Sequence, residues 1–150
     1  MTVYLEDLEP GTKYLSAGRT VTESDVVAFA GLSGDFSPLH TDEVWVREHT
    51  PFAGRIAHGA LVLSISEGLR TPVLDELEVL AFLEITRSFV APTYPGDTIR
   101  ARWMVKDRRA SRSRPGTGVV HVAVEVEKQD GTTVQRGTDV YLVACRPEPG

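Results

Sequence analysis

A short segment near position 40 gathers residue types that can move protons. Asp35 and His40 stand five residues apart, and Ser37 and Pro38 lie between them. Gly34, directly before the carboxylate, permits a tight turn, and proline restricts the backbone, so both side chains can point into one pocket. Histidine titrates near neutral pH, and a neighbouring carboxylate can fix its tautomer or share a water with it. The spacing suits acid–base catalysis, although such residues also serve as turn formers and local hydrogen-bond partners.

A second segment, His58-Gly59-Ala60, stands at the expected start of an apolar helix. The first N–H groups of a helix have no internal partner, and the helix dipole is positive there. A glycine leaves its N–H open to close approach, so this segment suits an anion or a developing oxyanion. The alternative is that Gly59 only permits close packing and that His58 is a structural hydrogen-bonding residue.

The elements that must position these residues are helical in the first half of the chain. Thr22 has the features of a helix N-cap, and its helix should end within 31–34. Thr41 or Asp42 can cap a second, short helix. The segment 57–69 is apolar almost all round, which is typical of a helix buried inside a fold.

The second half alternates apolar and polar residues with period two, which indicates antiparallel strands with one buried face. Four segments carry the strand pattern: Phe82–Val90, Ile99–Val105, Val120–Glu127 and Val134–Leu142. The apolar row of the last strand comprises Val134, Thr138, Val140 and Leu142. Asp130-Gly131 is a two-residue turn signal before that strand. The pattern predicts an α+β fold, a curved antiparallel sheet wrapped around the apolar helix.

Length and composition set limits on the class of protein. The 150 residues suit a single domain, with 147–150 as a frayed tail, and 41% hydrophobic content is ordinary for a globular protein. Cys145 is the one cysteine, so an internal disulfide is excluded and a reducing cytoplasm is expected. No apolar run is long enough to span a bilayer, so no membrane association is expected. The net charge of -5 argues against a nucleic-acid partner.

The charge is unevenly distributed. Seven of the sixteen basic residues lie within 100–114, where Asp107 is the one acid, so this stretch carries a net charge of +6. Arginine recognises phosphate through paired hydrogen bonds, and Arg112 and Arg114 lie in a predicted hairpin. The stretch therefore suits a phosphorylated partner. The alternative is a solvated turn whose charge protects the sheet edges.

The two chemical segments together resemble the MaoC-like dehydratase and (R)-specific enoyl-CoA hydratase family. The residues that carry the resemblance are the run 29–42, which includes Gly34-Asp35-Phe36-Ser37-Pro38-Leu39-His40, and the run 54–59, which ends in His58-Gly59. In that family the loop reads G-D-x-N-P-hydrophobic-H, and a later H-G opens the central helix of a hotdog fold.

The resemblance implies a reaction and roles for residues. Asp35 and His40 would hold one water and add it, with syn stereochemistry, to a 2-enoyl thioester, or remove it in reverse. The Gly59 N–H would stabilise the enolate oxygen, and Pro38, His58 and Ala60 would line the substrate site. No metal or separate cofactor is implied, since CoA or phosphopantetheine arrives as part of the substrate.

Two positions depart from the family pattern. Ser37 stands where the loop usually has asparagine, so the hydrogen bonding within the loop must differ. Glu67 stands where hydratases carry a serine on the central helix. If Glu67 faces the acyl tunnel, a polar acyl group is expected, because a buried carboxylate needs a partner. The alternative is that Glu67 points outward or pairs with Arg70 or Arg87.

Other readings of the same pattern stay open. A hotdog acyl-CoA thioesterase would use a carboxylate to activate water against the thioester carbon, and a non-catalytic acyl-binding subunit would use neither group. In each case the exposed face of the sheet carries apolar residues that a second copy would cover. We therefore expect a homodimer or a dimer of dimers.

Overall fold

The computed structural model describes residues 1–148, and its main feature is one antiparallel sheet. The sheet has the order β1-β4-β5-β6-β3, with β2 paired beside β1 on β4. The strands are β1 (Lys13–Leu15), β2 (Arg19–Thr20), β3 (Val79–Phe89), β4 (Thr98–Ala110), β5 (Thr117–Lys128) and β6 (Thr133–Ala144). The helices are a 3-10 turn (Leu5–Asp7), α1 (Glu23–Ser33), α2 (Pro38–Thr41), α3 (Glu43–His49), α4 (Gly59–Gly68) and α5 (Pro72–Asp75).

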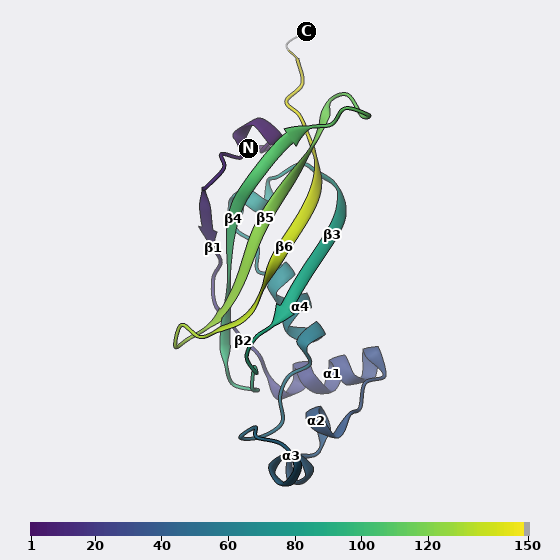
Figure 1. Ribbon diagram of the computed structural model, residues 1–150, viewed down its shortest axis with the longest axis vertical. Helices are drawn as coiled ribbons and strands as arrows, with labels where there is room; N and C mark the ends of the chain where they lie inside the picture. Colours follow the sequence, from purple (N-terminus) through teal and green to yellow (C-terminus); the bar gives the residue numbers. More distant parts are fainter. Residues whose placement is uncertain (149–150) are drawn as a thin grey trace.

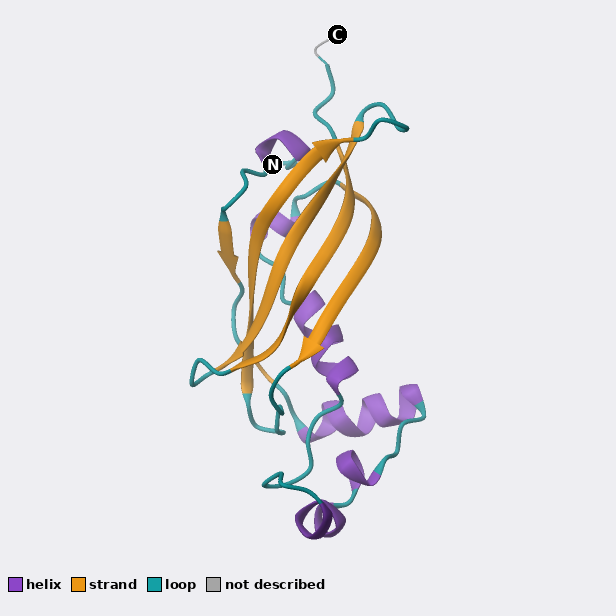
Figure 2. Cartoon of the chain, viewed as in Figure 1, coloured by secondary structure: helices purple, strands orange, loops and turns teal. Residues whose placement is uncertain are grey.

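The sheet curves around α4, and α1, α2 and α3 gather beyond one end of it (Figure 1). Helices lie on one side of the strands, so the core forms between that face and α4 (Figure 2). The alternating rows of β4 and β5 face this core and are buried: Ile99, Ala101, Trp103, Val105, Val120, Val122, Val124 and Val126. The predicted α+β fold, a curved sheet around a central helix, is confirmed.

One predicted row is wrong, and a bulge explains it. On β6, Val134 is an extra residue, because Val126 pairs with Gln135 whereas Glu127 pairs with Thr133. Val134 packs in the core, but Val140 lies on the opposite face from it, since Asp139 and Tyr141 are the inward residues beyond the bulge. A bulge shifts the alternation of a strand, and sequence periodicity does not reveal it.

The predicted helix boundaries in the first half are largely confirmed. Thr22 caps α1 in a reciprocal capping box with Asp25, and the helix ends at Gly34, whose φ is +78°. Asp42 caps α3 by accepting from Trp45 N–H. The expected single short helix is in fact two, because a one-turn helix, α2, precedes that cap.

The central helix is less enclosed than its composition predicts. Leu61, Val62 and Ser66 are buried. Ala60 and Ser64, which lie one turn apart on another face of α4, are exposed. The isolated chain therefore leaves part of an apolar helix uncovered. No helix among residues 1–148 is long and apolar enough to cross a membrane.

Candidate active site

His40 lies on the one-turn helix α2 and is held there by the backbone. Pro38 is the first residue of α2, where its missing N–H costs nothing. The His40 side chain is buried, and its Nδ1 lies 2.7 Å from the carbonyl oxygen of Ile56. A carbonyl only accepts, so Nδ1 carries a proton. Nε2 is therefore the ring atom that can exchange a proton.

That nitrogen faces the carboxylate of Asp35. Nε2 and Asp35 Oδ2 are 3.7 Å apart, which is too long for a hydrogen bond and leaves both atoms free to bind a third group. The Asp35 carboxylate is about half exposed, and its Oδ1 accepts from Ser37 N–H at 3.1 Å. The backbone of Ser37 thus orients the carboxylate. The hydroxyl of Ser37 provides no cap to α2, so this departure from the family pattern leaves the orientation of Asp35 intact.

His58 supports both groups from behind. Its Nε2 lies 2.9 Å from the carbonyl oxygen of Asp35, and its ring stacks on the ring of His40 with centroids 3.8 Å apart. It is buried and stands at the N-cap position of α4, without a side-chain hydrogen bond to the helix. The structure therefore favours the structural reading of His58, because its hydrogen bond and its stacked ring hold the loop that carries Asp35 and His40.

Asp35, His40 and His58 also place possible metal-ligand atoms within 4.8 Å of one another. The ring planes of the two histidines differ by only 27° in a stacked pair. A metal binds imidazole nitrogen in the plane of the ring, and two stacked rings lie in nearly parallel planes, which disfavours convergence of both lone pairs on one ion. His58 also commits Nε2 to a backbone carbonyl. The arrangement suits proton transfer better than metal binding.

Gly59 lies in the same cavity as His40. The cavity has a volume of about 500 Å³, and its lining is mostly apolar, with His40, Thr93 and Gln135 as the polar members. Gly59 opens α4 as predicted, and Ala60 also lines the cavity. A Cβ on Gly59 would lie 3.2 Å from the Phe89 ring, which explains the glycine. The structure thus brings the proton-transfer nitrogen and the free helix N-terminus into one pocket.

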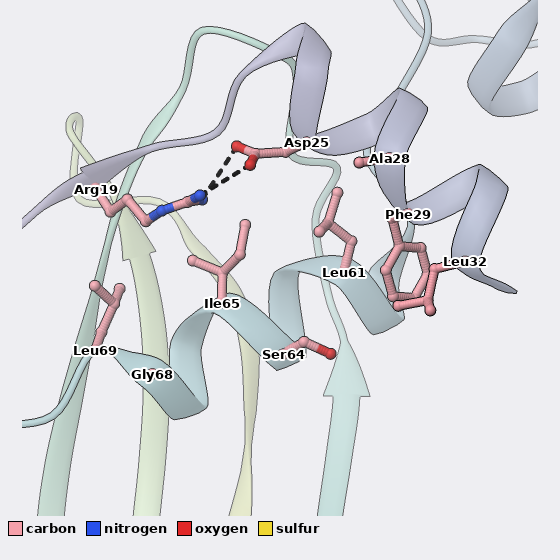
Figure 3. Close-up of a pocket in the computed structure, with 10 residues that line it drawn as sticks. All are labelled: Arg19, Asp25, Ala28, Phe29, Leu32, Leu61, Ser64, Ile65, Gly68 and Leu69. Atoms are coloured by element: carbon pink, nitrogen blue, oxygen red, sulfur yellow. Dashed lines mark hydrogen bonds and ion pairs between the residues drawn. The ribbon is translucent and has the colours of Figure 1, made fainter.

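A second cavity, of about 450 Å³, lies between α1 and another face of α4 (Figure 3). Its lining is apolar except for Ser64 and an Arg19–Asp25 ion pair of 2.8 Å. That pair holds the Asp25 pKa at about 2, because the guanidinium of Arg19 binds the carboxylate. Both charges are thus engaged with each other, and the chemistry belongs to the first cavity.

Glu67 lies elsewhere on α4, in a buried cluster. It pairs with Arg87 at 2.5 Å, and Arg87 in turn binds Asp139 through two hydrogen bonds of 2.6 and 3.1 Å. Burial, together with repulsion from Asp139, raises the pKa of Glu67 to about 7. The same environment raises the pKa of Tyr141, whose hydroxyl lies 3.5 Å from Glu67. The alternative in which Glu67 pairs with Arg87 is therefore the one observed, and Glu67 is outside the lining of the His40 cavity.

The structure does not bring Arg112 and Arg114 to this site. They lie at the tip of the β4–β5 hairpin, at the opposite end of the sheet from α2 (Figure 1). Their neighbours in the basic stretch are partly neutralised, since Arg102 pairs with Glu127 and Arg108 with Glu9. Within a single chain the two strands hold the hairpin away from the pocket, so the expected contact with substrate phosphates stays a prediction that requires a second subunit.

Two other residues of the pocket are not predicted from the sequence. Phe89 and Gln135 are paired neighbours on β3 and β6 and both line the cavity. An alternating strand pattern marks buried positions but does not indicate which of them face a pocket. The predicted row through Val134, Val140 and Leu142 places position 135 on the opposite face, because the bulge is not predicted.

Solved structures place the chain in the hotdog class. A monoamine oxidase regulatory protein from Archaeoglobus fulgius is 36% identical, with a TM-score of 0.88 and coverage of 97% of both chains. A MaoC-like dehydratase from Rhodospirillum rubrum is 31% identical, with a TM-score of 0.81 and coverage of 97% of this chain and 99% of that one. A Mycobacterium tuberculosis protein with a double hotdog fold has a TM-score of 0.86 at 24% identity, over 99% of this chain and 47% of that one.

Residues 7–137 match the MaoC like domain. The chain belongs to the family of MaoC-like domains. It is 39% identical over 101 residues to an (R)-specific enoyl-CoA hydratase from Rhodospirillum rubrum, an alignment that covers 65% of this chain and 66% of that protein. It is 33% identical over 111 residues to Protein MaoC from Klebsiella aerogenes, covering 74% of this chain. The chain thus spans a third of the MaoC protein and just under two thirds of the hydratase.

Proposed function

We propose that this chain is a hydro-lyase that adds water reversibly to the double bond of a 2-enoyl thioester. The observation that carries the proposal is the 3.7 Å approach of His40 Nε2 to Asp35 Oδ2 beside a cavity that also contains Gly59. Acid–base groups together with an oxyanion donor suit proton transfer next to a carbonyl. The names of the relatives, a hydratase and a dehydratase, point to the same reaction.

The reaction uses Asp35 and His40 as one unit. A water between Oδ2 and Nε2 loses a proton to one group while its oxygen bonds to C3 of the enoyl chain. The other group, which is protonated at the start, gives its proton to C2. Transfer of the proton taken from the water between the two groups then restores the starting state, so one water is added in full and no oxidant or cofactor is required. Because the two groups lie 3.7 Å apart and share one water, the oxygen and the proton reach the same face of the double bond, which makes the addition syn.

The negative charge that forms during the reaction develops on the thioester oxygen. The N–H of Gly59, at the start of α4, has no intrahelical partner and stabilises that oxygen. The apolar lining favours the acyl part of the substrate and excludes water, which strengthens the interaction. CoA or a carrier-protein phosphopantetheine would supply the thioester, and no separate cofactor takes part.

Glu67 bears on which acyl groups the site accepts. Its side chain is about one-fifth exposed, and its carboxylate, with Arg87, forms a polar cluster on the inner side of the sheet. Because Glu67 is outside the lining of the His40 cavity, only a chain longer than that cavity holds would meet these charges, which favours a short acyl group. Comparing crotonyl-CoA with longer enoyl-CoA esters for wild type and Glu67→Ala tests this. An unchanged chain-length preference contradicts a role for Glu67 in specificity.

The active form is proposed to be a homodimer, or a dimer of dimers, built on β3. This strand is the edge of the sheet and exposes a run of apolar side chains: Leu80, Phe82, Leu83 and Ile85. A long apolar edge strand is a template for pairing with another chain. Antiparallel pairing of two β3 strands would also bring the hairpin end of one subunit to the α2 end of the other. A phosphate-binding role for Arg112 and Arg114 depends on that assembly.

One assay separates this proposal from a thioesterase and from a binding subunit. Crotonyl-CoA is incubated with the protein while enoyl absorbance and free thiol are followed separately. The proposal predicts loss of absorbance without thiol. Release of thiol would indicate a thioesterase, and a silent assay together with saturable crotonyl-CoA binding would indicate a binding subunit.

A further inference from the structure

Gln135 is a buried polar residue whose role is not explained by the packing of the sheet. Its side chain is 2% exposed on the inner face of β6, directly after the bulge at Val134. The inward positions beside it are apolar on β5, where its partner is Val126. An apolar side chain would fill this place without the cost of burying an amide.

The amide of Gln135 reaches across to the first residue of α4. Its Nε2 donates to the carbonyl oxygen of Gly59 at 2.7 Å, while its Oε1 is buried without a partner. The first carbonyl of a helix already has the N–H four residues later as its donor, so Gly59 does not need this bond to be satisfied. A half-satisfied buried amide is costly, which indicates a role that outweighs the cost.

Phe89 completes the contact with the same glycine. Phe89 and Gln135 are opposite each other on β3 and β6, and the Phe89 ring lies 3.2 Å from where a Cβ of Gly59 would be. The sheet therefore contacts Gly59 at two places, the ring against Cα and the amide on the carbonyl. Together these contacts fix where the start of α4 lies relative to the cavity.

The bond also affects the next peptide group. A donor on the Gly59 carbonyl polarises the Gly59–Ala60 amide, because hydrogen bonds in a chain strengthen one another. This makes the N–H of Ala60, which is in the first turn of α4 and borders the cavity, a stronger donor. The N–H groups at the start of α4 thus gain both a fixed position and a larger positive charge.

We propose that Gln135 is a positioning residue for the oxyanion site, acting through Gly59. This inference rests on the hydratase function proposed above. Gln135 is not proposed to contact the reacting atoms of the substrate. Its effect is on the transition state, in which the thioester oxygen carries charge.

Two substitutions test the role. Gln135→Met keeps the length of the side chain but cannot donate, and Gln135→Glu can donate only when protonated. Removing one oxyanion donor lowers kcat about 10²–10³-fold. Losing the hydrogen bond that positions such a donor should therefore lower kcat less, by about tenfold. We expect kcat for crotonyl-CoA to fall about tenfold in both variants at pH 8, with KM within about twofold of wild type. Gln129→Met, in the exposed β5–β6 turn, is the matched control and should retain wild-type kcat.

The pH dependence distinguishes positioning from packing. Rates of both variants are measured from pH 5.5 to 8 and divided by the wild-type rate at each pH. This ratio removes the contribution of His40, which is the one titratable residue among the described residues lining the cavity. The ratio for Gln135→Glu should rise as its carboxyl takes up a proton, whereas the ratio for Gln135→Met should stay flat. Equal ratios at all pH values, or an unchanged kcat in both variants, would overturn the proposal.

A measurement without catalysis separates this inference from the proposed reaction. Hydrogen exchange at Val62, whose N–H donates to His58 O in the first turn of α4, should be several-fold faster in Gln135→Met than in the control. If wild type does not hydrate crotonyl-CoA but this exchange is faster, the reaction is wrong and the positioning of α4 stands. Unchanged exchange contradicts the positioning.

Discussion

At the scale of single residues, His40 presents one ring nitrogen to the cavity. Its Nδ1 is committed to Ile56, so the tautomer is fixed by the backbone and Nε2 alone can take up or release a proton. Asp35 faces that nitrogen with an oxygen that no other group occupies, while Ser37 holds its second oxygen. A pair of groups held in this way can exchange protons with a water without either side chain moving.

Removing either member of the pair should therefore abolish most of the activity. His40→Ala and Asp35→Asn are expected to lower kcat for crotonyl-CoA hydration by about 10²–10⁴-fold, the usual contribution of a positioned acid or base. Asp35→Asn preserves the shape of the loop, and His49→Ala, on the exposed end of α3, is the control. Full activity in either active-site variant would refute the acid–base pair.

Glu67 makes stability depend on pH. Its pKa is raised from an ordinary 4.5 to about 7, so the folded chain holds this proton more tightly than the unfolded chain. The stability contributed by the group is therefore complete below pH about 4.5 and is lost as pH rises through about 7. The loss at pH 8 is on the order of 3 kcal/mol.

Glu67→Gln removes the titrating carboxyl but keeps an oxygen for Arg87. We expect its free energy of unfolding in urea to be nearly independent of pH between 5 and 8, and to exceed that of wild type at pH 8. Glu48→Gln, on the exposed surface of α3, should retain the wild-type slope. A wild-type slope in Glu67→Gln would contradict the raised pKa.

At the scale of elements, the start of α4 links the sheet to the site. His58 precedes the helix and bonds to the backbone of Asp35, and Gly59 lies against β3 and β6. Adding one methyl group there should disturb the site more than the fold. Because the Phe89 ring is at 3.2 Å and is itself more than half exposed, it can move aside.

Gly59→Ala should thus remain folded, with a melting temperature within a few degrees of wild type, because α4 accepts alanine readily. Its kcat/KM for crotonyl-CoA should fall at least tenfold, since the displaced ring and shifted N–H both border the cavity. Thermal unfolding and steady-state kinetics check the two parts. Gly68→Ala, at the other end of α4, is the control and should retain full activity, because nothing lies within 4 Å of where its Cβ would be.

At the scale of the whole molecule, the uncovered edge of β3 and the open sides of α4 point to a second copy. Leu83→Lys combined with Ile85→Lys places charge on that edge, which should prevent strand pairing. Sedimentation should show wild type as a dimer or tetramer and the double variant as a monomer. A monomeric wild type, or an unchanged assembly of the variant, would contradict the proposed interface.

How far the sequence could predict this molecule depends on the range of the interactions. The strands at Ile99–Val105 and Val120–Glu127 and the caps at Thr22 and Asp42 follow from local patterns, and the structure confirms them. The proximity of Asp35 to His40 follows from the short loop between them. The bulge at Val134 depends on pairing between distant strands, which local periodicity does not encode.

The same limit explains the remaining differences at the site. The charge of Arg112 and Arg114 can be read from the sequence. Their distance from the pocket cannot, because it depends on the lengths and directions of two strands. The contact of Gln135 with Gly59 joins residues 76 positions apart. The predicted alternation of β6 places position 135 on the outer face, and the bulge at Val134 is what turns its side chain toward the helix.

The central claim is that Asp35 and His40 together add one water to one face of an enoyl thioester. The most direct measurement is hydration of crotonyl-CoA in D₂O, with the relative configuration at C2 and C3 read from proton NMR of the product. The account predicts a single diastereomer with deuterium and hydroxyl added syn, formed by wild type and lost in His40→Ala. Anti or mixed addition, or a product that forms equally well without His40, would contradict it.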